Sequence, residues 1–147
     1  MFKKSSQLLI CCMIGLILLI SCATSEHNKK GVESAMKHYD QLILRSDADS
    51  IALSYTPDGN LGDIAIGRDS IRRFLSTFKN IRVLTQSSVT DSIKISKDTA
   101  IQNGKYYQSD LISGKDTVFV KGIFIAKWLW AKNKQWQIKE MHTKAIK

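Results

Sequence analysis

The sequence predicts a single α+β domain in which helices pack on one face of a curved antiparallel sheet. Three stretches between Val32 and Phe78 repeat their apolar residues with a helical period. From Ile81 onward the period changes to two, as in strands, where successive side chains point to opposite faces. Short breaks rich in Gly, Ser, Asp and Lys divide this second half into consecutive runs, which is typical of antiparallel strands joined by turns.

Three helices are expected before residue 80. The first carries an apolar stripe at positions i, i+3, i+4 and i+7, formed by Val32, Ala35, Met36, Tyr39, Leu42 and Ile43. The second begins after Ser46-Asp47, a good capping pair, carries Ile51, Ala52 and Tyr55, and is expected to end in a tight turn at Thr56-Pro57-Asp58-Gly59. The third follows Gly67, is capped by Asp69 or Ser70, and turns inward Ile71, Phe74, Leu75 and Phe78.

Four strands are expected near Ile81–Lys94, Asp98–Leu111, Thr117–Lys132 and Gln135–Thr143. The last two form a long hairpin around Lys132-Asn133-Lys134. In the third strand the even positions from Val118 to Trp130 share one apolar face. The opposite face carries Phe119, Ile123, Ile125 and Leu129.

Unbroken alternation in the last strand places Glu140 and His142 on the same face as Trp136 and Ile138. Ionisable groups are costly to bury unless they are paired. Glu140 and His142 therefore indicate either a polar patch in a pocket or a strand end at which both side chains reach solvent.

Residues 1–21 are predicted to be a lipoprotein signal peptide, followed by a lipidated tether at 22–31 and a folded domain at 32–147. Lys3 and Lys4 precede the apolar run Leu8–Ile20, which is shorter than the roughly 20 residues that span a bilayer. Leu19-Ile20-Ser21-Cys22 resembles the bacterial lipobox, which implies acylation of Cys22. The alternative is an ordinary secretory signal with a chance cysteine. Ala23 is not the aspartate associated with inner-membrane retention, so the resemblance implies an envelope protein of the outer membrane.

The cysteines, charges and motifs of the sequence exclude several kinds of binding site and partner. Cys11 and Cys12 lie in the signal peptide and Cys22 carries the lipid, so the mature domain is expected to hold neither a disulfide nor a thiolate metal site. The formal net charge of +9 is spread along the chain without a dense basic stripe, so no nucleic-acid partner is expected. The three histidines show no metal-ligand spacing, and no phosphate loop or nucleophile elbow is present, so no cofactor is expected.

The order of these features resembles the nuclear-transport-factor-2-like superfamily, which includes ketosteroid isomerase and SnoaL-like proteins. The resemblance covers Val32–Thr143 and is carried by Ser46-Asp47, Tyr55, Pro57-Asp58-Gly59, Gly67, Ile71, Phe74, Trp128, Trp136-x-Ile138 and His142. It implies a cone, or cystatin-like roll, in which a strongly bent antiparallel sheet wraps the N-terminal helices. The open end of such a cone holds a mostly apolar pocket.

Within this resemblance, Tyr39 falls on the oxyanion-hole tyrosine of ketosteroid isomerase and Asp63 falls on its general base. The isomerase's second oxyanion donor falls on the apolar stretch Ile123–Ile125. The candidate catalytic residues are therefore Asp63, Tyr39 and His142, and the candidate ligand contacts are Tyr55, Tyr106, Trp128 and Glu140. The structural alternatives are a core tyrosine at 39, a solvated loop carboxylate at 63, and strand aromatics that form the core or a dimer contact.

Two functions remain open at this point. The favoured one is a membrane-anchored lipoprotein whose cone domain binds a small apolar ligand or an envelope partner without catalysis. The alternative is a ketosteroid-isomerase-like or SnoaL-like enzyme that performs acid–base chemistry on a small apolar carbonyl compound. The apolar outer face of the third strand also predicts a homodimer.

Overall fold

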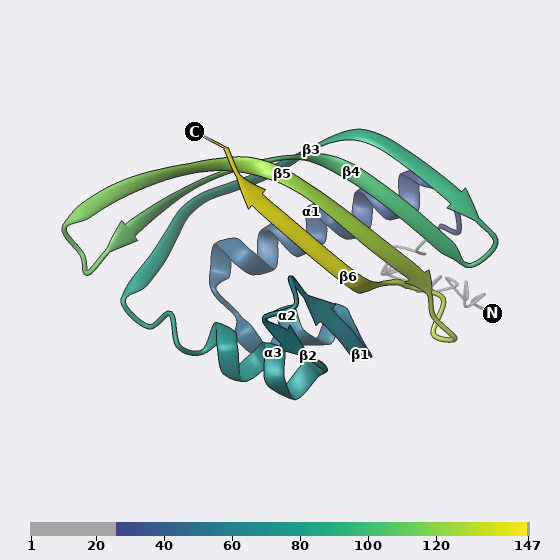
Figure 1. The fold of residues 1–147 in the computed structure, drawn as a ribbon, viewed down its shortest axis with the longest axis horizontal. Helices are drawn as coiled ribbons and strands as arrows, with labels where there is room; N and C mark the ends of the chain where they lie inside the picture. Colours follow the sequence, from purple (N-terminus) through teal and green to yellow (C-terminus); the bar gives the residue numbers. More distant parts are fainter. Residues whose placement is uncertain (1–25, 147) are drawn as a thin grey trace, which may run out of the picture.

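A computed structural model describes residues 26–146, so the predicted signal peptide, Cys22 and the start of the tether lie outside the described residues. Figure 1 shows a curled, unclosed six-stranded sheet with the helices in its concave side. This confirms the predicted α+β cone. The helices are α1 (Lys29–Arg45), α2 (Ala48–Leu53) and α3 (Arg68–Leu75). The strands are β1 (Tyr55–Leu61), β2 (Ala65–Ile66), β3 (Ile81–Ser96), β4 (Thr99–Ile112), β5 (Asp116–Trp130) and β6 (Trp136–Ala145).

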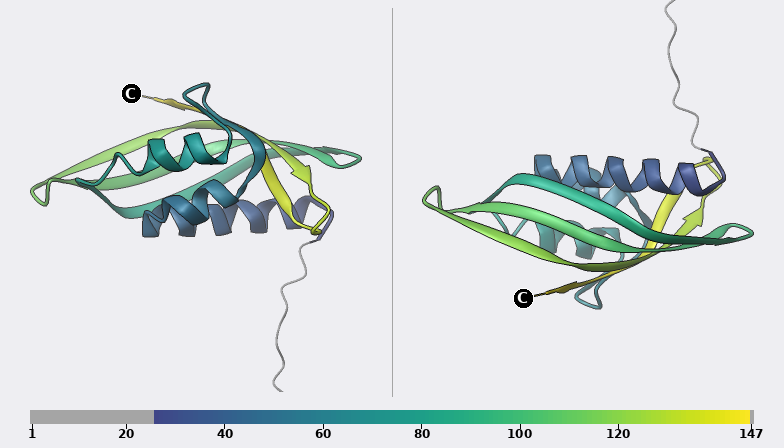
Figure 2. Two further views of the ribbon diagram at one scale, coloured as in Figure 1. Left: turned by 90° about the horizontal axis from the view of Figure 1, so that it is seen from below. Right: turned by 90° about the horizontal axis from the view of Figure 1, so that it is seen from above.

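The sheet is mixed, with the strand order β2-β1-β6-β5-β4-β3. The four long strands from β3 to β6 pair antiparallel with their sequence neighbours, whereas β1 pairs parallel with β6. Figure 2 shows the helices together on one side of the sheet, which leaves the other side uncovered within the described residues. All eight ends of the four expected long strands are confirmed to within two residues.

Helix α1 lies inside the curve because its apolar stripe faces the sheet. Asn28 caps its first turn by accepting a hydrogen bond from the Gly31 amide at 3.0 Å, and Ser46 ends it in a left-handed conformation. Val32 and Leu42 are buried. Asp40, at the edge of the stripe, accepts a hydrogen bond of 2.8 Å from the Ser88 backbone amide. Because β3 is an edge strand, this bond satisfies a backbone donor that no further strand pairs.

The prediction of a tight turn at Thr56–Gly59 is wrong, since these residues belong to β1 and Tyr55 begins that strand. Proline cannot donate a ladder hydrogen bond and is tolerated in a strand only at irregular or unpaired positions. The pairing of β1 with β6 is irregular between Tyr55 and Asn60, so Pro57 lies where no regular ladder bond is required. The predicted side-chain cap of the third helix is also wrong. Gly67 occupies the cap position with a φ of 81°, which favours glycine.

The face predicted for Glu140 and His142 is wrong because β6 contains a β-bulge. Lys127 pairs with Glu140 and Trp128 pairs with Ile138, so Lys139 is an extra residue without a partner on β5. One extra residue exchanges the faces of every residue that follows it. Met141 consequently points inward and is only 3% exposed, whereas Glu140 forms an outer ion pair with Lys127 at 3.3 Å.

Candidate functional site

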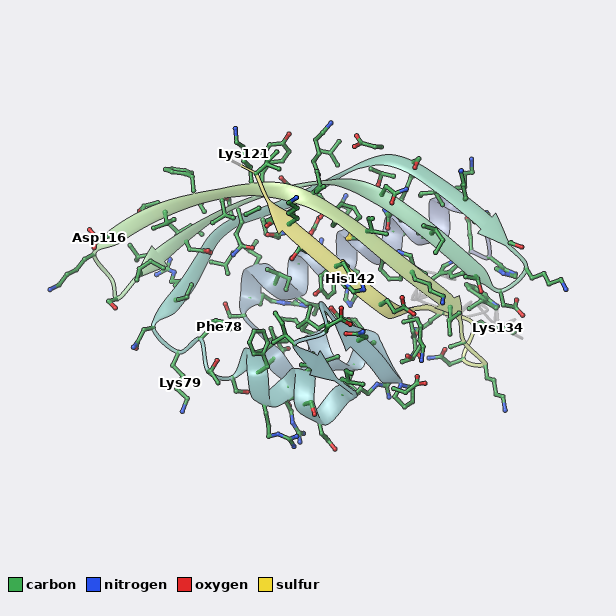
Figure 3. The ribbon with its side chains drawn as sticks, in the orientation of Figure 1. Phe78, Lys79, Asp116, Lys121, Lys134 and His142 are labelled. Carbon is green, nitrogen blue, oxygen red and sulfur yellow. The ribbon has the colours of Figure 1, made fainter. Side chains whose placement is uncertain are left out.

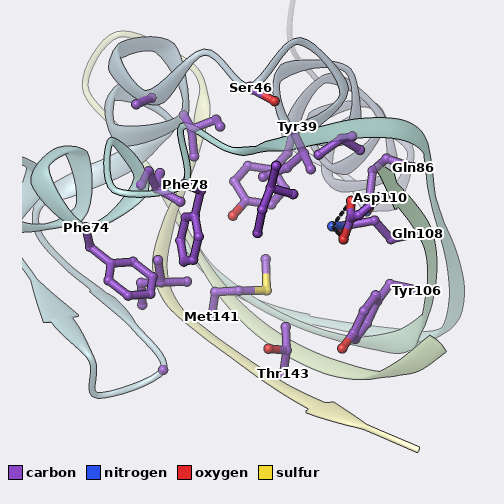
Figure 4. A pocket seen from close by; sticks show the side chains of 18 of the residues that line it. Tyr39, Ser46, Phe74, Phe78, Gln86, Tyr106, Gln108, Asp110, Met141 and Thr143 are labelled. Atoms are coloured by element: carbon purple, nitrogen blue, oxygen red, sulfur yellow. Dashed lines mark hydrogen bonds between the residues drawn. The ribbon is translucent and has the colours of Figure 1, made fainter. Parts of the chain in front are cut away.

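An open cavity of about 640 Å³ lies between the helices and the concave face of the sheet. Figure 4 shows it from close by. Its walls come from the C-terminal half of α1, from α3 and the segment after it, and from the inward faces of β3 to β6. Most of the lining side chains are apolar, among them Met36, Ile43, Phe74, Phe78, Phe124 and Met141. The cavity lies where the resemblance implied one, at the open end of the cone.

The phenol ring of Tyr39 lines this cavity. Its hydroxyl oxygen lies 3.0 Å from that of Tyr55, which is completely buried behind it. Burial raises the pKa of Tyr39 to about 12, and the charge of Asp40 adds to this effect while the Tyr55 hydrogen bond opposes it. Burial also raises the pKa of Tyr55 well above its usual value. Both phenols are therefore neutral at physiological pH and can donate hydrogen bonds.

A buried carboxylate lies in the same cavity at Asp110, near the end of β4. This side chain is 8% exposed, and Gln108 Nε2 donates to both of its oxygens at 2.8 Å. None of the ion pairs formed among residues 26–146 includes Asp110. A carboxylate offers about four acceptor positions, so this group retains unused acceptor capacity.

A second amide borders this polar part of the cavity. Gln86 lies directly opposite Gln108 in the β3–β4 ladder and donates from Nε2 to Asp40 Oδ1 at 2.9 Å. Its carbonyl oxygen is buried and has no hydrogen-bond partner in the described part of the chain. Figure 4 shows Gln86, Gln108 and Asp110 together on one wall, apart from the hydroxyl of Tyr39. This wall therefore has more acceptors than donors.

Asp63 and His142 come together as a pair, but outside the cavity. The carboxylate of Asp63 lies 3.9 Å from His142 Nδ1, and the two side chains are 75% and 43% exposed. Asp63 has a positive φ of 59°, a conformation that aspartate tolerates better than most residues. It also exchanges two hydrogen bonds with Asn60 across the β1–β2 turn. These contacts give Asp63 a structural role in the turn, and the sequence-based expectation that it shares a pocket with Tyr39 is not met.

Of the four predicted ligand contacts, only Tyr106 lines the cavity. Tyr55 lies directly behind Tyr39, and Glu140 is on the outer face because of the bulge. Trp128 is 1% exposed and donates from its indole nitrogen to Gln102 Oε1 at 2.9 Å, so it belongs to the core. Tyr106 remains in the site because it packs across Gly122, where any Cβ would meet its ring at 2.4 Å.

Sequence reasoning missed Asp110, Gln108 and Gln86, the polar groups of the cavity. The signal that could have found them was strand parity: Gln108 and Asp110 share the parity of Tyr106, the predicted ligand contact. Within residues 26–146, no group of three or more His, Cys, Asp and Glu side chains could hold a metal ion. In the same residues, no helix is long and apolar enough to cross a membrane.

A strongly bent sheet around an N-terminal helix, with an apolar cavity at its open end, defines the nuclear-transport-factor-2-like fold, and the comparison with solved structures shows this fold for the chain. A ketosteroid isomerase-like protein from Erwinia carotovora atroseptica has a TM-score of 0.69 at 17% identity, and the match covers 79% of this chain and 94% of that one. ActVI-ORFA from Streptomyces coelicolor has a TM-score of 0.61 at 16% identity, covering 78% and 93%.

A third similar structure, from Catenulispora acidiphila, was solved in complex with S-DNPA. Its TM-score is 0.63 at 11% identity, and the match covers 78% of this chain and 90% of that one. Comparison of the sequence with family models and with curated proteins gave no match. At these identities the likeness is one of fold, so function has to be argued from the cavity.

Proposed function

We propose that this chain is a lipid-anchored protein of the bacterial cell envelope whose cone domain binds a small ligand without transforming it. The observation that carries the proposal is the open cavity of about 640 Å³ with largely apolar walls. Small-molecule sites typically have volumes of roughly 300–1,000 Å³ and combine apolar walls with a few polar groups. The cavity matches this description in size and in lining.

The polar wall indicates which chemical groups a ligand must carry. Asp110 accepts hydrogen bonds from Gln108 alone among the described residues and is otherwise free to accept from a ligand. Tyr39 offers one hydroxyl to the same cavity. A ligand with an apolar body and one hydroxyl or N–H group would bury its body against Phe78 and Met141 and donate to Asp110. Binding would then satisfy an acceptor that is costly to leave unpaired.

The positions of the predicted catalytic residues support a role without catalysis. An isomerase of the ketosteroid type needs its general base and its oxyanion donor around one substrate. Tyr39 lines the cavity, but Asp63 and His142 are exposed and pair with each other at the β1–β2 turn. The catalytic residues that the resemblance implied therefore lie at two separate sites, the cavity and the β1–β2 turn.

One observation favours the enzymatic alternative. Tyr39 and Asp110 line the same cavity. Asp110 could take a proton from the carbon beside a carbonyl group and return it to another carbon, while the neutral phenol of Tyr39 donates to the enolate oxygen between the two steps. The substrate would be a small apolar carbonyl compound. Loss of turnover with retained binding in Asp110→Asn would establish this alternative.

The proposed anchor is the acylated Cys22, with placement in the outer membrane. Its support is the sequence of the first 22 residues, where a basic start, an apolar run and a lipobox-like tetrapeptide follow in order. Mass spectrometry of the membrane-extracted protein should find an acylated N-terminal cysteine, and Cys22→Ser should abolish it. An unmodified N-terminus at another residue would contradict the anchor and leave the proposal for the cavity unaffected.

The cavity can be tested with N-phenylnaphthylamine, a neutral probe that combines an apolar body with one N–H donor and fluoresces in apolar surroundings. We expect the wild-type chain to enhance its fluorescence. Met141→Trp should weaken probe binding by about tenfold or more, because the larger side chain fills the cavity. His142→Trp is the matched control, since the neighbouring residue faces outward. No enhancement with the wild type, or equal effects of the two variants, would contradict a ligand-binding cavity.

A further inference from the structure

The N-terminal end of the described chain is fastened to one end of the domain. His27 stacks on Trp130 with ring centroids 4.7 Å apart, and its Nε2 lies 3.1 Å from the Lys97 carbonyl oxygen. Trp136 donates from its indole nitrogen to the Glu26 carbonyl oxygen at 2.9 Å. These contacts fix the direction in which the tether leaves the domain, beside the β3–β4 and β5–β6 turns. We call this region, made of residues 26–30, 97–98 and 132–135, the tether end.

Only Ala23, Thr24 and Ser25 separate Cys22 from the fastened Glu26. Four residue steps span at most about 14 Å even when fully extended. This length is too short to let the tether pass around the domain, because α1 alone has 17 residues and is about 25 Å long. Acyl chains on Cys22 would therefore hold the tether end close to the bilayer.

The charge of the tether end fits a lipid surface. Five exposed lysines belong to the tether end, at positions 29, 30, 97, 132 and 134, against the two acidic residues Glu26 and Asp98. Glu26 is engaged by Lys30 at 4.0 Å, and Asp98 lies 3.4 Å from His27 Nε2. Basic side chains beside a membrane anchor attract anionic headgroups.

Several residues that line the cavity lie toward the other end of the domain. Ser46, at the C-terminal end of α1, and Phe78 and Lys79, after α3, border the cavity. Figure 3 shows Phe78 and Lys79 far from Lys134, which marks the tether end. A domain held at the tether end therefore presents its cavity away from the bilayer.

From these observations we propose that the tether end docks on anionic phospholipid headgroups, so that the cavity faces the aqueous compartment and takes its ligand from solution and not from the bilayer. This inference rests on the lipid anchor proposed above. The contacts of His27 with Trp130 and of Glu26 with Trp136 give the chain one defined direction of exit from the domain, and this direction sets the orientation.

The orientation can be measured with single engineered cysteines, because the mature chain has no cysteine other than Cys22, whose sulfur the lipid occupies. Lys134→Cys places a fluorophore at the tether end, and Lys79→Cys places the same fluorophore at the cavity mouth. The acylated full chain is reconstituted into vesicles of phosphatidylethanolamine and phosphatidylglycerol that contain headgroup-nitroxide lipid. We expect strong quenching at position 134 and little at position 79. His27→Ala should reduce this difference, whereas His38→Ala, a change of an exposed histidine on α1, should not.

Three outcomes distinguish the proposed orientation from the proposed lipid anchor on which it rests. Acylated chain with quenching stronger at 134 supports the orientation. Acylated chain with equal quenching, or stronger quenching at 79, overturns the orientation and leaves the anchor intact. A chain that mass spectrometry of the same sample finds without acyl groups overturns both. The same measurement in vesicles of phosphatidylcholine alone tests the role of the lysines. Equal quenching at positions 134 and 79 in these vesicles, with stronger quenching at 134 once phosphatidylglycerol is added, would identify the lysines as the source of the orientation.

Discussion

The hydroxyl oxygens of Tyr39 and Tyr55 lie 3.0 Å apart at the boundary between the cavity and the core. Their surroundings differ, because Tyr39 lines the cavity and Tyr55 is completely buried. Among residues 26–146, Tyr39 is the one hydrogen-bond partner of the Tyr55 hydroxyl. Tyr39→Phe removes this partner, and we expect it to lower the free energy of unfolding by about 1–3 kcal/mol. Tyr55→Phe should cost about 1 kcal/mol, since the Tyr39 hydroxyl can still reach water in the cavity.

The double variant tests this asymmetry. When both hydroxyls are absent, no buried polar group is left unpaired, so the double variant should be more stable than Tyr39→Phe alone. Urea denaturation of the wild type and the three variants gives the values. Costs that simply add would show that the two hydroxyls do not depend on each other.

The pKa of Tyr39 predicts a loss of stability in alkali. Burial raises this pKa from 10.0 to about 12, so the folded chain keeps the phenolic proton after the unfolded chain has released it. The folded state then binds more protons than the unfolded state, and stability must fall as the pH rises from 10 to about 12. The loss attributable to Tyr39 is about 2–3 kcal/mol. Urea denaturation across this range should show a shallower decline in Tyr39→Phe, while Tyr107→Phe, at an exposed tyrosine of the outer face, should follow the wild type.

The β-bulge predicts that β6 tolerates the loss of Lys139 better than the gain of a residue after it. Deletion of Lys139 removes the extra residue and leaves Glu140 opposite Lys127 and Met141 opposite Ala126, so both side chains keep their faces. Insertion of one alanine between Glu140 and Met141 would turn Met141 outward, and we expect a loss of about 3–5 kcal/mol or no folded protein. Circular dichroism and urea denaturation measure both. An insertion no worse than the deletion would show that the number of residues between Ile138 and Met141 does not set the register.

The uncovered face of the sheet predicts self-association. Phe119 is 82% exposed, and Ile123 and Ile125 lie on the same face of β5. We expect the lipid-free domain to form dimers through this face, because contiguous apolar surface is costly in water. Ile125→Lys should shift sedimentation toward the monomer, and Leu53→Lys, at an exposed leucine of α2, should not. A wild-type domain that remains monomeric at high concentration would contradict this prediction.

Much of the fold could be predicted from the sequence because its signals are local and repeated. The apolar stripe of α1 sets its element type, and the long alternating runs of β3 to β5 set element type and, within two residues, the ends of these strands. Strand β1 was missed because Pro57 and Gly59 are the strongest local signs of a turn. Its strand conformation depends on β6, a partner distant in sequence, and a single-sequence pattern does not contain that contact.

The candidate site was harder to predict because one residue changes its composition. The assignment of alternate residues to opposite faces assumes a strand without a bulge. The residue types of Ile138, Lys139 and Glu140 do not indicate a bulge. The count therefore directed Glu140 and His142 inward in place of Met141. Tyr39 and Tyr106 do line the cavity, since α1 and β4 are regular through this region. Asp110 went unnoticed because a polar residue near a strand end is usually solvated, and only the curl of the sheet encloses it.

The position of β6 also has a consequence for when the chain can fold. Among the described strands this one comes last along the chain, yet it lies between β5 and β1, and the other neighbour of β1 in the described sheet is the two-residue β2. The first and last strands must therefore meet before the sheet is continuous, and such distant pairings close slowly. A nascent chain that still lacks Trp136–Ala145 cannot complete its sheet. We expect such a chain to remain unfolded until this last strand is added.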